Sequence, residues 1–218
     1  MVLQSSVRLG EVRKHKMDRR RVMAIGVAAF VVPGCSGNWG VKYSDVPEPN
    51  KAKNWYVVGV RVTVPDSLTV SEANTYAPSA DIVWHGEEQG DRRAQVRAII
   101  KEGLSRGSRK LDGRKGVILA ARVIQFHAVT PIAVNQAPGA VHNIKYDLQV
   151  YNARTLKPLT DPQRVSADLQ ANVGTSAVIA AINGNTQRVR IVRHLTAVTE
   201  GWLGLGPDQR GTFEGIGR

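Results

Sequence analysis

Alternating apolar residues predict a β-strand directly after residue 54. In the segment 55–64, WYVVGVRVTV, polar Arg61 and Thr63 face one way and every second residue on the other face is apolar. A period of two is typical of a strand with one buried face. Pro65 ends the segment, because proline has no amide hydrogen to donate to a neighbouring strand. Residues 81–85 predict a second, shorter strand. The residues expected on the apolar face of the first strand are Tyr56, Val58, Val60, Val62 and Val64.

A helix is predicted next, because apolar residues in the segment 90–107 recur every three to four positions. Asp91 lies at its start and is a suitable N-cap, since an aspartate side chain accepts a hydrogen bond from the free amides of the first turn. The helix is therefore expected to be amphipathic, with an apolar face toward a sheet. The charged residues expected on its outward face are Arg92, Arg93, Arg97, Lys101 and Glu102.

Three further strands are predicted in succession. The segment 116–129 is apolar on both faces, which suits a central strand. The segments 141–153 and 162–171 alternate, and the second places Asp168 on its polar face. Consecutive strands joined by short connections favour an antiparallel meander.

The helical period returns at residues 176–202, where Gly184 is expected to break or kink the helix. The sequence thus predicts an α/β (α+β) fold over residues 55–204. We expect a small two-layer sandwich, with a mostly antiparallel sheet of about five strands and two main helices packed on it. Residues 205–218 are rich in glycine without a period, so a disordered tail is expected.

The first 34 residues have the layout of a secretory signal peptide. Three arginines, Arg19–Arg21, precede an apolar run from Val22 to Val32. This run has 11 residues, whereas a membrane-spanning helix needs roughly 20. Met17 stands just before the arginines and is an alternative start. Export is therefore favoured over a permanent transmembrane anchor.

The sequence VPGC that ends at Cys35 resembles a bacterial lipobox, although Pro33 is unusual in that motif. We expect Cys35 to be the lipidated first residue of the mature chain, against the alternative of a buried helix with a chance cysteine. Residues 35–54 are then expected to form a tether, because glycine, proline, asparagine and serine are scattered through them. Ser36 is not aspartate, which by resemblance to lipoprotein sorting favours the outer membrane, with the inner membrane as the alternative.

Charge and cysteine content narrow the functional classes. The formal net charge is +12, but the leader holds seven Lys or Arg against two acidic residues, so its removal takes away +5 and leaves +7. The remaining basic residues lie on and after the two predicted helices without interleaved aromatic residues, which does not suit a nucleic-acid reader. Contact with anionic lipid headgroups or an acidic partner stays open. The single cysteine excludes disulfides within the chain and multi-cysteine zinc motifs.

Two histidines are the weak candidates for a metal site. His127 and His142 flank the loop between two predicted antiparallel strands, and a register in which residue numbers sum to 269 places them opposite each other. The same register pairs Asp147 with Arg122 as an expected ion pair. No HExxH spacing accompanies the histidines, so we expect structural roles for them and no metal or cofactor.

The loop HGEEQGD holds the densest group of carboxylates, Glu87, Glu88 and Asp91. Two nearby carboxylates could serve acid–base chemistry. Nothing in the sequence supplies a nucleophile or a GxSxG elbow beside them. We therefore expect a solvated helix-entry loop, favoured by the helix dipole, and no enzyme.

The chain resembles an uncharacterised family of small bacterial periplasmic lipoproteins. The resemblance lies in DIVWHGEEQGDRRAQV, QFHAVT, GAVHNIKYDLQVY and GNTQRVRIVRHL, which fall within residues 55–203. The order of elements is also similar to that of the auxiliary lipoproteins of ABC-type lipid transporters, a likeness at the level of fold alone.

These observations leave three hypotheses. The first is a periplasmic lipoprotein, held in the membrane by acyl chains on Cys35, that acts as a non-enzymatic binding or assembly module with an envelope protein as partner. The second is an auxiliary subunit of an envelope ABC-type lipid or solute transporter. The third is an envelope hydrolase that uses His127 or His142 with a carboxylate such as Asp147 or Glu87.

Overall fold

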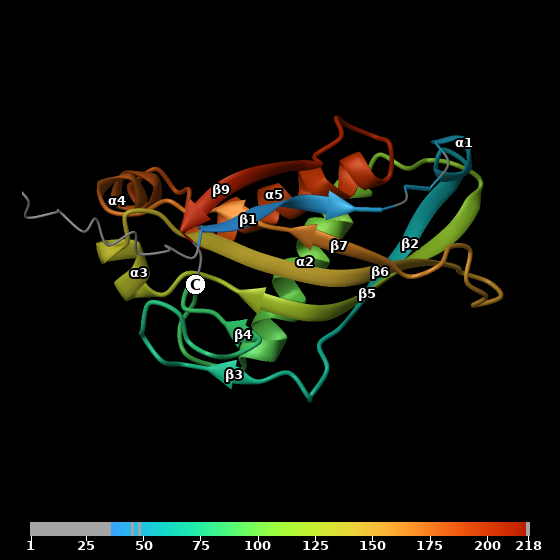
Figure 1. Cartoon of the computed structure of the whole chain (residues 1–218). Helices are drawn as coiled ribbons and strands as arrows, with labels where there is room; N and C mark the ends of the chain where they lie inside the picture. Colours follow the sequence, from blue (N-terminus) through green and yellow to red (C-terminus); the bar gives the residue numbers. More distant parts are fainter. Residues whose placement is uncertain (1–35, 45, 48, 217–218) are drawn as a thin grey trace, which may run out of the picture. The chain divides into compact units, whose positions relative to one another are not determined.

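The structure is a computed structural model that describes residues 36–44, 46–47 and 49–216 (Figure 1). The expected signal peptide and Cys35 lie outside these residues. Five helices are described: α1 (Pro49–Ala52), α2 (Arg92–Gly107), α3 (Pro131–Gln136), α4 (Thr175–Ile182) and α5 (Gln187–Trp202). The described strands are β1 (Ser36–Tyr43), β2 (Trp55–Thr63), β3 (Val70–Ser71), β4 (Ile82–Val83), β5 (Lys115–His127), β6 (Val141–Asn152), β7 (Gln163–Ala167), β8 (Leu169–Gln170) and β9 (Gly211–Ile216).

The described strands form one open mixed sheet of nine strands, larger than the five expected. Its main order is β3-β4-β5-β6-β7-β1-β9, with β2 also paired to β5 and β8 to β6. The predicted meander of β5, β6 and β7 is confirmed, since both of its pairs are antiparallel. Strands β2 and β4 instead pair with β5 in parallel. The parallel pair of β2 and β5 is joined by α2, as such a crossover requires.

The two expected main helices, α2 and α5, are confirmed and lie together on one face of the sheet (Figure 1). Asp91 caps α2 as predicted, with its carboxylate accepting a hydrogen bond from the Ala94 amide at 3.0 Å. Apolar side chains of both helices are fully or almost fully buried in the core that the helices share with the sheet. The helix residues in this core are Val96, Ile99, Ile100, Leu104, Ile191, Val192, Leu195, Val198 and Trp202.

The apolar face predicted for β2 is wrong in its first half. Tyr56 and Val58 are 43% and 52% exposed, while Val60 packs against the core. A register irregularity between Val57 and Gly59 is the cause, because an extra residue in a strand exchanges its two faces. Alternation in the sequence continues through this bulge and so does not reveal it.

Both ends of the described chain differ from the expected tether and tail. Residues 36–43 form β1, which pairs with β7, and residues 211–216 form β9. These two terminal strands pair with each other in antiparallel fashion, from Ser36 opposite Ile216 to Val41 opposite Gly211. Each strand supplies the partner that the other needs, so neither is recognisable as a strand in isolation.

Asp168 interrupts the last strand predicted before the second helix. Its side chain is buried rather than on a wet face, and it divides the segment into β7 and β8. The carboxylate accepts hydrogen bonds from the Gly40 amide, the Asn143 side chain and the Ile144 amide. Burial raises the pKa of this carboxyl, and the two backbone donors oppose that change. Asp168 thereby connects β1 to β6.

Candidate functional site at the α3–α4 end

The two histidines expected to face each other lie in different surroundings. A register irregularity between Val123 and Gln125 shifts the pairing of β5 and β6 by one residue, so His127 stands opposite Asn143 instead of His142. A shift of one residue turns a side chain to the other face of a sheet. The two histidines therefore do not form a common site.

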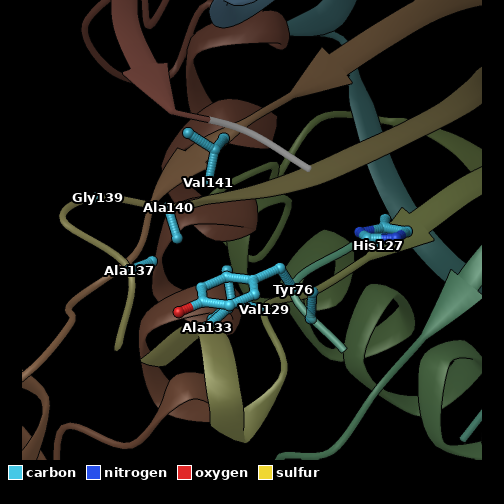
Figure 2. Close-up of a pocket in the computed structure, with 9 residues that line it drawn as sticks. Tyr76, His127, Val129, Ala133, Ala137, Gly139, Ala140 and Val141 are labelled. Carbon is cyan, nitrogen blue, oxygen red and sulfur yellow. The ribbon is translucent and has the colours of Figure 1, made fainter. Parts of the chain in front are cut away.

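His127 lies at the end of β5 beside a small cavity of about 70 Å³ (Figure 2). Its Nε2 atom is 2.9 Å from the carbonyl oxygen of Pro78. The cavity is otherwise lined by Tyr76 and by small or apolar residues of the segment 128–141, which contains α3. A volume of this size suits a few waters and is far below the several hundred Å³ of ordinary ligand pockets.

His142 is fully buried where β6 meets α5. Its Nδ1 accepts a hydrogen bond from the Val129 amide at 3.4 Å, and its Nε2 has no hydrogen-bond partner among the described residues. Burial, together with the nearby Arg190 and His194, lowers the pKa of His142 to about 3. The imidazole is thus held neutral at the base of α5.

The expected register of Arg122 opposite Asp147 is confirmed, but the expected ion pair is wrong. Asp147 also stands opposite Arg164 on its other side, in β7, and its ion pair is with Arg164. A residue of a central strand has two cross-strand neighbours. The sequence register identified one of them, and the structure selects the other.

The carboxylates of the 87–91 loop connect secondary-structure elements. Glu87 accepts hydrogen bonds from the Trp84 indole at 2.8 Å and from the Arg188 guanidinium at 3.0 Å. Asp91 caps α2, and the carbonyl oxygens of Glu87 and Glu88 both accept from Arg92. These contacts account for the loop as the join between the start of α2 and the start of α5.

Several basic residues expected on solvated helix faces have internal partners. Arg92 is 6% exposed and forms an ion pair with Glu72, which overturns its predicted outward position. Glu72 had no signal in the sequence, because its partner lies on another element. Arg188 contacts both Glu87 and Glu102. Much of the basic character of α2 and α5 is therefore used within the domain.

The most unusual exposed feature is α4. Val178 and Ile179 are each 55% exposed and Ile182 is 80% exposed, and no residue of this helix is buried. The side of α4 that faces the domain carries only alanine, at positions 177, 180 and 181, and borders a cavity of about 240 Å³ between α3, α4 and the start of α5. The sequence predicted the helical period and the break at Gly184, whose φ is 71°, but not that the large side chains point outward.

Helices α3 and α4 lie at the same end of the sheet (Figure 1). The Gly174 amide, just before α4, donates a hydrogen bond to the carbonyl oxygen of Val134 in α3 at 2.7 Å. No Asp, Glu, Lys or Arg occurs between Arg122 and Lys145 or between Asp168 and Arg188. We call this part of the molecule, residues 131–140 and 172–187, the uncharged end.

Among the residues that the structure describes, no group of three or more His, Cys, Asp or Glu side chains is arranged to hold a metal ion. No helix among the described residues is both long enough and apolar enough to cross a bilayer.

The fold and this end define a small α+β protein with a mixed sheet, one helical layer and an exposed apolar helix. The chain belongs to a family of unknown function, DUF6778, which it matches over residues 55–218. The match begins at β2 and includes β9, whereas β1 lies before it. No curated protein matches the chain.

Two solved structures are similar to the chain at low identity. One is a provisionally assigned lipoprotein from Caulobacter crescentus CB15, with 11% identity over 72% of this chain and 94% of the other, and a TM-score of 0.31. The second is a point variant of the PelC dodecamer from Paraburkholderia phytofirmans, with 13% identity over 72% and 95% of the two chains and a TM-score of 0.29. Scores this low carry no argument about the function of this chain.

Proposed function

We propose that this protein is a periplasmic lipoprotein, anchored by acyl chains on Cys35, whose domain is a non-enzymatic binding or assembly module of the cell envelope. The sequence observation that carries the proposal is the arginine cluster, the short apolar run and the VPGC motif, in that order and before the domain. We further propose the outer membrane as its location, since Ser36 follows the cysteine.

The start of β1 gives the anchor a geometric consequence. Ser36 is the first residue of β1 and the next residue after Cys35. Successive Cα atoms lie about 3.8 Å apart, so an anchor at Cys35 brings the start of β1 to the membrane surface without a flexible spacer. The module would work against the bilayer, and not at the end of a long tether.

A binding role is supported over catalysis by what the polar candidates do. Glu87 joins α2 to α5, Asp147 pairs with Arg164, and His142 is enclosed without a carboxylate partner. A general acid or base must reach its substrate, and these groups are engaged in the fold or enclosed by it. Helix α4, in contrast, exposes an apolar surface, which suits association.

The anchor is tested by replacing Cys35 with Ser in the full chain, with Ser36→Ala as the matched control. We expect metabolic palmitate labelling and globomycin-sensitive processing to be lost in C35S and retained in S36A. Labelling that survives in C35S would overturn the lipid anchor.

The location is tested by Ser36→Asp against the same S36A control. Separation of inner and outer membranes on a density gradient is expected to show S36A in the outer fraction and S36D shifted toward the inner one. An unaltered distribution of S36D would remove the argument for the outer membrane.

The module is tested by crosslinking in intact envelopes followed by affinity capture. A specific envelope protein recovered with the wild-type chain supports the binding role. Recovery of a transporter permease would instead favour the auxiliary-subunit hypothesis, and turnover of an envelope polymer or ester by the purified chain would overturn the non-enzymatic assignment.

A further inference from the structure

We propose that α4 is a membrane-contact helix, which inserts Val178, Ile179 and Ile182 into the bilayer interface beside the lipid anchor. This inference rests on the proposed function, because it takes the membrane at Cys35 as given. It adds to the lipid anchor a protein surface that contacts the bilayer. It thereby fixes which end of the domain faces the bilayer.

The first observation is the inverted arrangement of α4. A helix held by a protein core normally turns its large apolar residues inward. In α4 the large residues point outward and the alanines face a cavity of about 240 Å³. The helix therefore does little to fill the domain, while its outer surface exposes contiguous aliphatic side chains. Such a surface indicates an interaction site.

The second observation is the lack of charge around this helix. Within the uncharged end, no Asp, Glu, Lys or Arg lies on α3 or α4, although 22% of the chain is charged. Charged side chains resist transfer into the interior of a bilayer, whereas aliphatic ones favour it. Arg193, at the rim, contacts the Asn185 side chain at 2.9 Å and can reach toward headgroups.

The third observation is the position of this end relative to the expected anchor. Ser36 pairs with Ile216, and the neighbouring Gly215 lies so close to Val141 that a Cβ there would be 2.6 Å from the valine Cγ2. Val141 begins β6 and pairs with Gln170, shortly before α4. The start of β1 and helix α4 therefore lie at the same end of the sheet (Figure 1).

A lipid surface fits these observations better than a protein partner does. A stable protein interface buries about 800 Å² on each partner, and three aliphatic side chains on a helix of 8 residues offer far less. Shallow insertion needs only a short apolar face, and the acyl chains proposed on Cys35 already hold the domain at the membrane, so α4 has to supply only a second contact. The anchor and α4 would together fix the orientation of the domain.

The test compares two valines of matched exposure, Val178 on α4 at 55% and Val58 on β2 at 52%. Val58 lies beside Val57, which pairs with Val117 near the start of β5. Helices α3 and α4 lie beyond the opposite end of β5 (Figure 1). Each valine is replaced in turn by Cys in the full chain and labelled with an environment-sensitive fluorophore. Cys35, if acylated, carries no free thiol.

The labelled, mature protein is reconstituted into vesicles of phosphatidylethanolamine and phosphatidylglycerol that contain a doxyl lipid. We expect several-fold stronger fluorescence quenching at Val178→Cys than at Val58→Cys. A lipid with its doxyl group near the headgroup should quench Val178→Cys more than a lipid with the group near the end of the acyl chain. That order follows from insertion by about 5–10 Å, as for interfacial helices.

Flotation of the same vesicles separates the two proposals. Protein that floats but shows equal, weak quenching at both positions overturns the role of α4 and leaves the anchor intact. Protein that does not float overturns both. Disulfide crosslinks between copies of the unlabelled Val178→Cys protein, together with no quenching of the labelled one, would show that α4 contacts a second copy and would also overturn the lipid assignment.

Discussion

Helices α4 and α5 follow each other in the chain and have the same apolar period, yet their large side chains have opposite fates. In α5, Ile191 and Leu195 are fully buried. In α4, Ile182 is 80% exposed and no residue is buried. The period shows that each helix has an apolar face, but the surface that covers that face has to come from elsewhere in the fold.

Helix α5 has such a partner in α2, and the reason is visible in two glycines. A Cβ on Gly103 would lie 2.5 Å from the Cβ of Leu195, and one on Gly107 would lie 2.5 Å from the Thr196 carbonyl oxygen. The absence of side chains at these positions lets the two helices approach closely. Helix α4 meets no surface of this kind and borders a cavity.

The largest expected effect comes from replacing an isoleucine by alanine in α5 and, for comparison, in α4. Ile191→Ala should lower the free energy of unfolding by roughly 2–5 kcal/mol, because it removes a fully buried side chain and leaves a cavity. Ile182→Ala should change it by no more than about 0.5 kcal/mol, since the side chain is largely in solvent. Denaturant unfolding of both variants in parallel measures the two values. A cost for Ile182→Ala close to that of Ile191→Ala would mean that α4 is packed by its large residues after all.

A smaller effect concerns the contact of α2 with α5. Glycine to alanine in a helix ordinarily adds up to about 1 kcal/mol of stability. Gly103→Ala should instead lower stability by about 1–3 kcal/mol, because its Cβ would collide with the base of the Leu195 side chain. Ser105→Ala, half-buried two positions along the same helix, is the control and should be neutral or slightly stabilising. Equal stability of the two variants would show that the helices can separate at little cost.

The elements predicted from the sequence were those whose signal is local. Asp91 beside an apolar period identified α2, and the alternation in residues 141–153 identified β6. The two register irregularities, at Val57–Gly59 and at Val123–Gln125, leave the alternation of each strand unchanged. They nevertheless decide whether Tyr56 is buried and whether His127 meets His142, because a shift of one residue exchanges the faces.

The remaining differences depend on contacts between distant parts of the chain. Strands β1 and β9 form because each provides backbone partners for the other across almost the whole sequence. Asp168 is buried because Gly40 and Asn143 supply donors to it from two other strands. Of the candidate site, the sequence predicted the helical residues of α4 and the break after them. Their outward direction is a property of the packing, which no local pattern contains.

The last predicted effect is a pH dependence, compared between pH 7.5 and 5, and it concerns the first part of α5, where this helix covers His142. The pKa of His142 is about 3 in the folded protein, against an ordinary 6.5, because burial and the neighbouring Arg190 and His194 disfavour the charged form. The unfolded chain therefore binds a proton below about pH 6.5 that the folded chain does not. The contribution of His142 to the free energy of unfolding should be complete above pH 6.5. It should fall by up to about 1.4 kcal/mol per pH unit as the pH drops toward 3.

His142→Asn removes the titrating imidazole and leaves a side-chain oxygen that can accept the hydrogen bond from the Val129 amide. At pH 7.5 the variant should be less stable than the wild type, since packing is lost. That deficit should shrink by about 1 kcal/mol or more between pH 7.5 and 5, because only the wild type loses the His142 contribution. His194, whose pKa burial also lowers, titrates in both proteins and cancels in the difference. Denaturant unfolding at a series of pH values measures how the free energy of unfolding of each protein changes with pH. Equal slopes for the two proteins would show that His142 is protonated within the fold and would contradict its enclosure under α5.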